Sequence, residues 1–76
     1  MPTTKIQVYK NGKLATNVKV VLEFTGLTNM GFTKAHYTNA QGVAFVEHSS
    51  TGIANVYLNG SKNGSLRTPG QEIYYL

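Results

Sequence analysis

The chain has 76 residues, no cysteine, and seven Lys and Arg against three Glu, which gives a formal net charge of +4. A chain of this length buries about 60% of its unfolded surface on folding. That is enough for one small domain over residues 1–76, and too little for a second domain or a large buried catalytic cavity. Without cysteine there is no disulfide and no thiolate metal site.

The positive charge comes from a shortage of acidic residues rather than from a basic cluster. The basic residues are spread along the chain at Lys5, Lys10, Lys13, Lys19, Lys34, Lys62 and Arg67. Nucleic-acid-binding surfaces usually gather such residues on one face. A basic nucleic-acid-binding barrel is therefore only a second alternative function.

The sequence shows neither a membrane-spanning stretch nor a signal peptide at its start. No apolar stretch approaches the roughly 20 residues of a membrane-spanning helix, and residues 1–5 lack the apolar centre of a signal peptide. We expect a cytoplasmic protein if the sequence is complete, an extracellular or cell-surface module if it is an excised domain, and no membrane insertion in either case.

Apolar and polar residues alternate along most of the chain, a pattern typical of β-strands. Glycines and turn-forming pairs interrupt the alternation at intervals of roughly ten residues. The sequence predicts seven strands, over residues 5–10, 18–25, 32–38, 43–48, 53–58, 61–67 and 71–76. This is an all-β chain, and we expect a seven-stranded antiparallel β-sandwich, with a small barrel as the alternative.

The first half of the chain contains the clearest strand and turn signals. Asn11-Gly12 favours a tight turn, because both residues tolerate positive φ. In the strand over 18–25 the inward residues are Val18, Val20, Leu22 and Phe24. Residues 26–30 are predicted to form a loop that carries Leu27 and Met30.

A four-residue loop, residues 39–42, is predicted to join the strands over 32–38 and 43–48 as a hairpin. Pairing across this loop sets Thr38 opposite Val43, His36 opposite Phe45 and Lys34 opposite Glu47. The Lys34–Glu47 charge pair supports that register.

In the last third of the chain, Asn59-Gly60 and Thr68-Pro69-Gly70 predict turns. Asn63-Gly64 is either a bulge in the strand over 61–67 or the true turn of its hairpin.

Two segments resemble a known family. The first, Asn11-Gly12-Lys13-Leu14-Ala15-Thr16-Asn17-Val18-Lys19-Val20-Val21-Leu22, is similar to the opening of transthyretin-like, carboxypeptidase-regulatory-like modules. The second, Thr38-Asn39-Ala40-Gln41-Gly42-Val43-Ala44-Phe45, resembles their second signature, with Asn39 where the family often has Asp. These motifs also recur in bacterial Ig-like and surface-repeat modules. The resemblance implies a β-sandwich, of the transthyretin-like or Ig-like kind.

The sequence gives no set of catalytic or metal-binding residues. Family members that hydrolyse a purine-derived ring use a C-terminal Tyr-Arg-Gly-Ser motif, whereas this chain ends Glu72-Ile73-Tyr74-Tyr75-Leu76. By the predicted register His36 and His48 face opposite ways, so we do not expect them to converge. Ser49 and Ser50 have no predicted base and acid beside them. We therefore expect no enzyme, no cofactor and no metal.

Five tyrosines are the candidate binding residues: Tyr9, Tyr37, Tyr57, Tyr74 and Tyr75. Tyrosine is enriched at protein interfaces and binding surfaces. Tyr9 and Tyr57 are predicted to face away from the core, and the adjacent Tyr74 and Tyr75 cannot both point inward. Cross-strand packing on a sheet is the simplest role for these residues, and a glycan- or protein-binding patch is the other.

Three predicted strands are apolar on both faces, over residues 20–22, 43–46 and 73–76. A small sandwich normally exposes one face of each sheet to water. We therefore expect a non-enzymatic interaction module that contacts proteins or glycans and self-associates as a homodimer or larger assembly. A small carbohydrate-binding module that uses surface tyrosines is the first alternative function.

Overall fold

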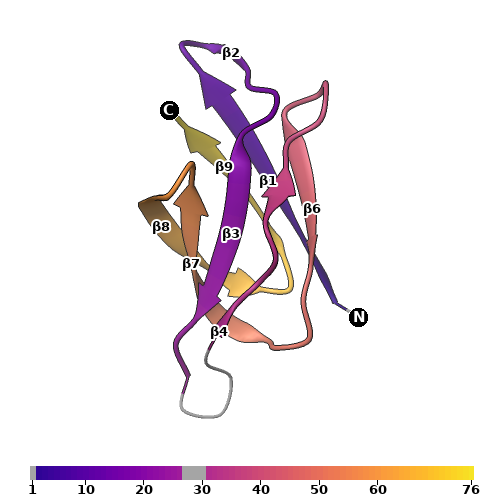
Figure 1. The fold of residues 1–76 in the computed structure, drawn as a ribbon, viewed down its shortest axis with the longest axis vertical. Helices are drawn as coiled ribbons and strands as arrows, with labels where there is room; N and C mark the ends of the chain where they lie inside the picture. Colours follow the sequence, from indigo (N-terminus) through magenta and orange to yellow (C-terminus); the bar gives the residue numbers. More distant parts are fainter. Residues whose placement is uncertain (1, 27–30) are drawn as a thin grey trace.

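The computed structural model describes residues 2–26 and 31–76, so most of the predicted loop over 26–30, including Leu27 and Met30, lies outside the described residues. Among the described residues 63% lie in strands and none lies in a helix. The strands form two sheets that pack face to face (Figure 1). The predicted all-β architecture is confirmed at this level.

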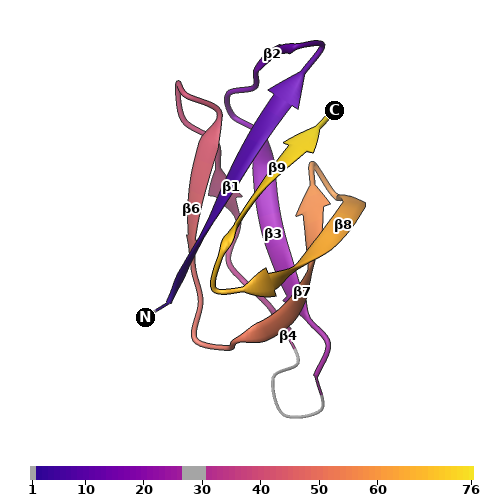
Figure 2. The ribbon, with the colours of Figure 1, turned by 180° about the vertical axis from the view of Figure 1, so that it is seen from behind.

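Sheet A is built around β1, which pairs on both of its edges. Three strands pair with β1: antiparallel β2 and β6, and parallel β9. The bounds are β1 Thr3–Lys10, β2 Lys13–Leu14, β6 Val43–Glu47 and β9 Gln71–Tyr75. The parallel pair differs from the all-antiparallel sandwich expected from the sequence. It arises because the chain passes from sheet B to sheet A through residues 69–70 and then runs alongside β1 (Figure 2).

Sheet B is antiparallel throughout the described residues. Its central strands are β3 and β7, with β8 beyond β7 and the short β4 and β5 on the other side of β3. The bounds are β3 Lys19–Phe24, β4 Gly31–Phe32, β5 His36–Tyr37, β7 Gly52–Leu58 and β8 Ser61–Thr68.

The core lies between the two sheets and follows the predicted alternation. In β1 the alternate residues Ile6 and Val8 are fully buried, and in β3 the inward residues Val20, Leu22 and Phe24 are buried. The remaining core side chains are Ala15, Val18, Ala44, Val46, Ala54, Val56, Leu58, Leu66 and Tyr74. Full burial of one such large apolar side chain contributes about 1.5–3 kcal/mol.

The predicted turns at residues 11–12, 39–42 and 59–60 are formed, whereas residues 69–70 form a bend that carries the chain from sheet B to sheet A. Asn11 and Gly12 have φ of 54° and 79°, as a tight turn with two positive φ values requires. The sequence left two roles open for Asn63-Gly64, and the structure shows the bulge: Tyr57 lies opposite Lys62 while Val56 lies opposite Gly64. The hairpin itself turns at residues 59–60.

The predicted strand over 32–38 is wrong. Only β4 and β5 form in this range, and both pair with β3 rather than with β6. Instead β6 pairs with β1, where Glu47 lies opposite Thr3, so the expected Lys34–Glu47 register does not form. In this long-range pairing with β1, Ala44 and Val46 are buried in the core.

Thr38 fixes the point where the chain leaves sheet B. Its backbone N–H donates to the Val18 carbonyl at 3.1 Å, and its hydroxyl accepts the Val18 N–H at 2.9 Å. The same hydroxyl donates to the Ala15 carbonyl at 2.6 Å. This buried side chain is therefore fully satisfied, and it holds the start of the 39–42 turn.

Candidate functional site

The solvent-facing side of sheet A carries the candidate binding surface. Residues paired across adjacent strands project on the same side of a sheet. Tyr9 lies between Leu14 and Tyr75, Gln7 between Val43 and Ile73, and Lys5 between Phe45 and Gln71. We call this surface outer face A and define it by Lys5, Gln7, Tyr9, Leu14, Phe45, Gln71, Ile73 and Tyr75.

Outer face A exposes large apolar side chains. Tyr75 is 72% exposed, Phe45 56%, and Leu14 and Ile73 45% each. These residues come from three strands of one sheet, β2, β6 and β9, whose other face covers the core. The sequence predicted apolar residues on both faces of two of these strands, and in the single chain the outward residues Phe45, Ile73 and Tyr75 are exposed, whereas Val43 is buried.

Tyr9 and Tyr75 are stacked on this face. Their ring centroids lie 5.6 Å apart with 21° between the ring planes. Tyr9 is half-buried, so it supports the exposed Tyr75 ring from below. Offset stacking of this kind contributes about 0.5–1.5 kcal/mol beyond area burial, and it gives Tyr75 a fixed orientation before any partner arrives.

A shallow hollow of about 310 Å³ lies beside the stacked rings. Four of the five residues that line it are polar: Lys5, Gln7, Gln71 and Glu72, with Ile73 as the fifth. The Gln7 side-chain amide reaches the Gln41 carbonyl only at 3.4 Å. The hollow thus offers an ammonium group, two amides and a carboxylate, one outward residue pair along the strands from Tyr9 and Tyr75, which do not line it.

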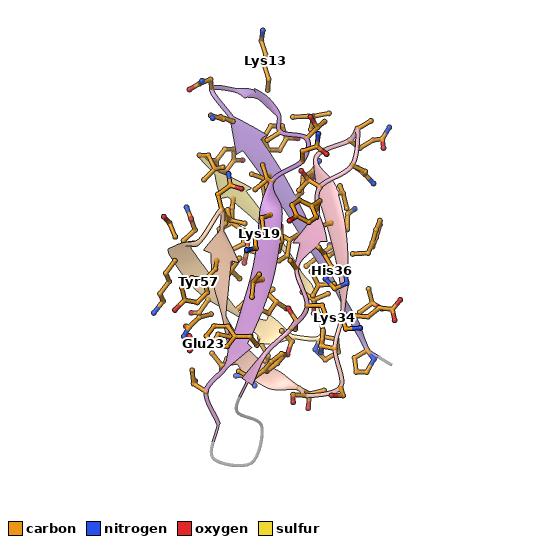
Figure 3. The ribbon with its side chains drawn as sticks, in the orientation of Figure 1. Lys13, Lys19, Glu23, Lys34, His36 and Tyr57 are labelled. Carbon is orange, nitrogen blue, oxygen red and sulfur yellow. The ribbon has the colours of Figure 1, made fainter. Side chains whose placement is uncertain are left out.

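The solvent-facing side of sheet B carries Tyr57 and Tyr37, so the structure separates them from Tyr9 and Tyr75. Glu23 accepts a hydrogen bond from the Tyr57 hydroxyl at 3.0 Å and one from the Asn55 amide at 3.1 Å (Figure 3). The bond to Glu23 raises the pKa of Tyr57, with smaller contributions from burial and from the charge of Glu23. Phe32 packs at 6.2 Å from the Tyr57 ring.

Tyr74 points into the core and Tyr75 does not, in agreement with the prediction that the two adjacent tyrosines cannot both point inward. It is only 9% exposed, and a Cβ placed on Gly64 would lie 3.0 Å from its ring. Burial raises the pKa of Tyr74, and the charge of Glu72 adds to the effect. Its hydroxyl is buried and has no hydrogen-bond partner among residues 2–26 and 31–76. Tyr74 is therefore a packing residue and lies outside any surface patch in this conformation.

His36 and His48 line the same cavity, contrary to the prediction that they would not converge. The cavity has a volume of about 490 Å³, and its lining includes Phe24, Phe32, Lys34, Ser49 and Ser50. The prediction failed because it rested on the hairpin register that does not form. In the structure His36 belongs to β5 on sheet B, and His48 follows β6 on sheet A.

His48 is bonded through both ring nitrogens. Its Nδ1 lies 2.6 Å from the Ser50 carbonyl and its Nε2 lies 2.7 Å from the Thr4 hydroxyl. A carbonyl only accepts, so Nδ1–H donates and Nε2 of the neutral ring accepts the Thr4 O–H. The ring also packs 5.4 Å from Phe24. These contacts tie the first strand to the loop after β6, which is a structural role that the sequence did not reveal.

The described residues that line this cavity do not form a hydrogen-bonded set of nucleophile, base and acid. Ser50 meets His48 through its carbonyl rather than its hydroxyl. The His36 Nδ1 donates to the Lys34 carbonyl at 2.9 Å. Residues 2–26 and 31–76 contain no group of three or more His or Glu placed to hold a metal ion.

In the same residues no helix is long and apolar enough to cross a membrane.

Three of the basic side chains lie on separate parts of the molecule. Lys13 extends from the end that carries the β1–β2 turn, Lys19 lies on sheet B, and Lys34 lies near His36 (Figure 3). The structure thus gathers none of these three into one patch.

Comparison with known proteins finds no match: no protein-family model, no curated protein and no solved structure is similar to this chain.

Proposed function

We propose that this domain is a non-enzymatic, self-associating interaction module whose contact surface is outer face A. The observation that carries the proposal is the exposure of Leu14, Phe45, Ile73 and Tyr75 together on one sheet face. Contiguous exposed apolar surface of this kind on a small soluble domain marks an interaction site. A second copy offers a face of the same chemistry, which a two-fold dimer requires.

Outer face A is favoured over the corresponding side of sheet B because of where the charges lie. On sheet B the exposed Phe32, Tyr37 and Ile53 each lie opposite a charged partner, namely Glu23, Lys19 and Arg67. On the outward side of sheet A the charged residues are Lys5, opposite Phe45, and Glu47, opposite Thr3 at the end of the strand, whereas Leu14, Ile73 and Tyr75 all lie opposite uncharged residues. Charged residues are depleted in the core of protein interfaces, so sheet A is the better surface for burial against another chain.

For the finer architecture, we propose a β-sandwich of the transthyretin-like or Ig-like kind. The two packed sheets and the formed turns at residues 11–12 and 39–42 support it, because these turns carry the residues on which the resemblance rests.

Self-association is tested by light scattering from micromolar to millimolar protein. The variant Leu14→Ser/Phe45→Ser removes exposed apolar area from outer face A without touching the core. The matched control, Phe32→Ser/Ile53→Ser, removes similar area from sheet B. We expect the average mass of the natural chain to rise with concentration, the first variant to stay monomeric and the control to behave as the natural chain does. A monomer at every concentration would overturn the proposal.

A second candidate, carbohydrate binding, is favoured by the polar hollow beside the Tyr9–Tyr75 stack. Aromatic rings stack on the apolar faces of sugars, while amides and carboxylates bond their hydroxyls. A glycan array run with the natural chain, Tyr75→Ala and the control Tyr37→Ala tests it. Binding lost only in Tyr75→Ala would support this function, and an empty array would exclude it for the glycans displayed.

A further inference from the structure

Strand β9 has one backbone edge that pairs with no other strand among the described residues. Two hydrogen bonds fix which groups lie there: the Lys5 N–H donates to the Gly70 carbonyl at 2.9 Å, and the Leu76 N–H donates to the Tyr9 carbonyl at 2.7 Å. Backbone groups of successive strand residues point to opposite edges. The even-numbered residues of β9 therefore face β1, and the N–H and C=O groups of residues 71, 73 and 75 point outward.

The other sheet edges carry features that hinder the addition of a strand. β8 displays Lys62 and Arg67 and is bulged opposite Val56 and Tyr57. β4 and β5 have only two residues each. At the start of β6, Asn39 bonds both the carbonyl and the N–H of Val43, at 2.9 and 3.2 Å. Bulges, charges and short strands are the usual protections against edge pairing.

β9 has less protection: it pairs with β1 without a bulge, it has five residues, and its one charged side chain is Glu72. Between Gln71 and Tyr75 there is no Lys, Arg or Pro, and the side chains of Ile73 and Tyr75 are exposed. The Ile73 N–H donates to the Glu72 carboxylate at 3.3 Å, which is long for a hydrogen bond. A backbone carbonyl from an added strand could replace this weak local contact at a shorter distance.

We infer that β9 pairs, antiparallel and edge to edge, with β9 of a second copy of this chain, so that two copies of sheet A become one continuous sheet. The choice of partner rests on the proposed self-association. A two-fold axis at Ile73 brings the outward groups of residues 71, 73 and 75 face to face, which gives about six backbone hydrogen bonds. Glu72 then lies opposite Tyr74 of the other copy, so no like charges oppose each other.

This edge contact is distinct from contact through outer face A. It uses backbone groups of β9 and leaves Leu14 and Phe45 uncovered. A pair of five-residue strands buries less than a standard interface of about 1,600 Å², so the association is weak and depends on protein concentration.

Two substitutions of one residue separate the backbone from the side chain. Ile73→Pro removes the outward N–H, yet it spares the bonds to β1, because an edge strand tolerates proline where its N–H faces solvent. Ile73→Thr changes the side chain to a polar one and keeps the N–H. We expect Ile73→Pro to weaken association at least about tenfold relative to Ile73→Thr, a difference of about 1.4 kcal/mol. Equal association of the two variants would overturn the inference.

Amide hydrogen exchange on the natural chain gives a test that no variant can spoil by misfolding. We expect the amides of Ile73 and Tyr75 to become more protected as protein concentration rises. If they stay unprotected while Leu14→Ser/Phe45→Ser abolishes association, the edge pairing fails and the proposed function stands. If that double variant still associates and Ile73→Pro does not, the edge pairing stands and outer face A is not the contact.

Discussion

The Thr4 hydroxyl donates to Nε2 of His48 across 2.7 Å, and both residues are buried, although 44 positions separate them in the sequence. The bond holds the start of β1 against the loop that follows β6. We expect Thr4→Val to destabilise the domain by about 1–3 kcal/mol, because it leaves a buried imidazole nitrogen without a donor. Urea unfolding measures the loss.

A double-mutant cycle shows whether that loss belongs to the Thr4–His48 pair. His48→Phe keeps a ring against Phe24 but removes both hydrogen bonds. If the pair interacts as described, Thr4→Val costs at least about 0.5 kcal/mol less in the His48→Phe background than in the natural chain. Strict additivity of the two substitutions would contradict the bond.

The Tyr74 hydroxyl is a buried polar group that finds no hydrogen-bond partner in the described part of the chain. Replacing Tyr74 with Phe removes the free-energy cost of burying an unbonded hydroxyl and keeps the packing of the ring. We expect Tyr74→Phe to leave the free energy of unfolding unchanged or to raise it by up to about 1 kcal/mol at neutral pH. A loss of more than 1 kcal/mol in thermal or urea unfolding would show that the hydroxyl has a partner in solution.

Tyr74 also makes the domain sensitive to alkali. Its pKa is raised in the folded state, so folded chains hold this proton more tightly than unfolded chains do. Titration of Tyr74 therefore leaves the free energy of unfolding unchanged below the ordinary tyrosine pKa of 10.0, and it lowers that free energy as pH rises through the folded pKa. We expect Tyr74→Phe to retain more of its stability above pH 10 than the natural chain, as measured by urea unfolding at stepwise higher pH. The same alkaline loss in both proteins would contradict this.

Tyr57 offers a titration that reports on Glu23 directly. The hydrogen bond to the Glu23 carboxylate is the main reason that its pKa is raised. We expect Glu23→Gln to lower the pKa of Tyr57 toward 10.0, while Glu47→Gln, remote from Tyr57, leaves it unchanged. Ring-proton shifts followed by NMR through alkaline pH give both values, and an unchanged Tyr57 titration in Glu23→Gln would contradict the contact.

Position 42 requires glycine for two reasons: the backbone φ is positive, and neighbouring backbone atoms leave no room for a Cβ. Its φ is +73°, and a Cβ there would lie 2.8 Å from the Val8 carbonyl oxygen. Gly12 has a similar φ of +79° but open space around it. We expect Gly12→Ala to cost about 1–2 kcal/mol for the left-handed conformation and Gly42→Ala to cost clearly more. Equal losses of unfolding free energy in the two variants would show that the backbone around residue 42 shifts to accommodate a Cβ at little cost.

The sequence was sufficient to predict the features that depend on neighbouring residues. Alternation identified the inward residues of β1 and β3, and the conformational freedom of Asn11-Gly12 identified the first turn. The predicted pairing of residues 32–38 was wrong because β6 pairs with the distant β1, and the short strands β4 and β5 pair with β3. The same long-range choice placed His36 and His48 at one cavity, and no local pattern contains that information.

The candidate binding residues were predicted in part for the same reason. Alternation placed Tyr9 outward, and the adjacency of Tyr74 and Tyr75 required them to point in different directions. That Tyr75 stacks on Tyr9, and not on Tyr57, follows from the parallel pairing of β9 with β1. Pairing between strands some 60 residues apart depends on the whole chain.

Concentration-dependent NMR tests the central claim most directly, because it locates the contact surface residue by residue without a substitution. Amide and methyl shifts are followed as the natural chain is diluted from millimolar to micromolar concentration. The account predicts shift changes concentrated at Leu14, Phe45, Ile73 and Tyr75. Spectra that do not change on dilution, or changes confined to Phe32, Tyr37 and Ile53, would contradict it.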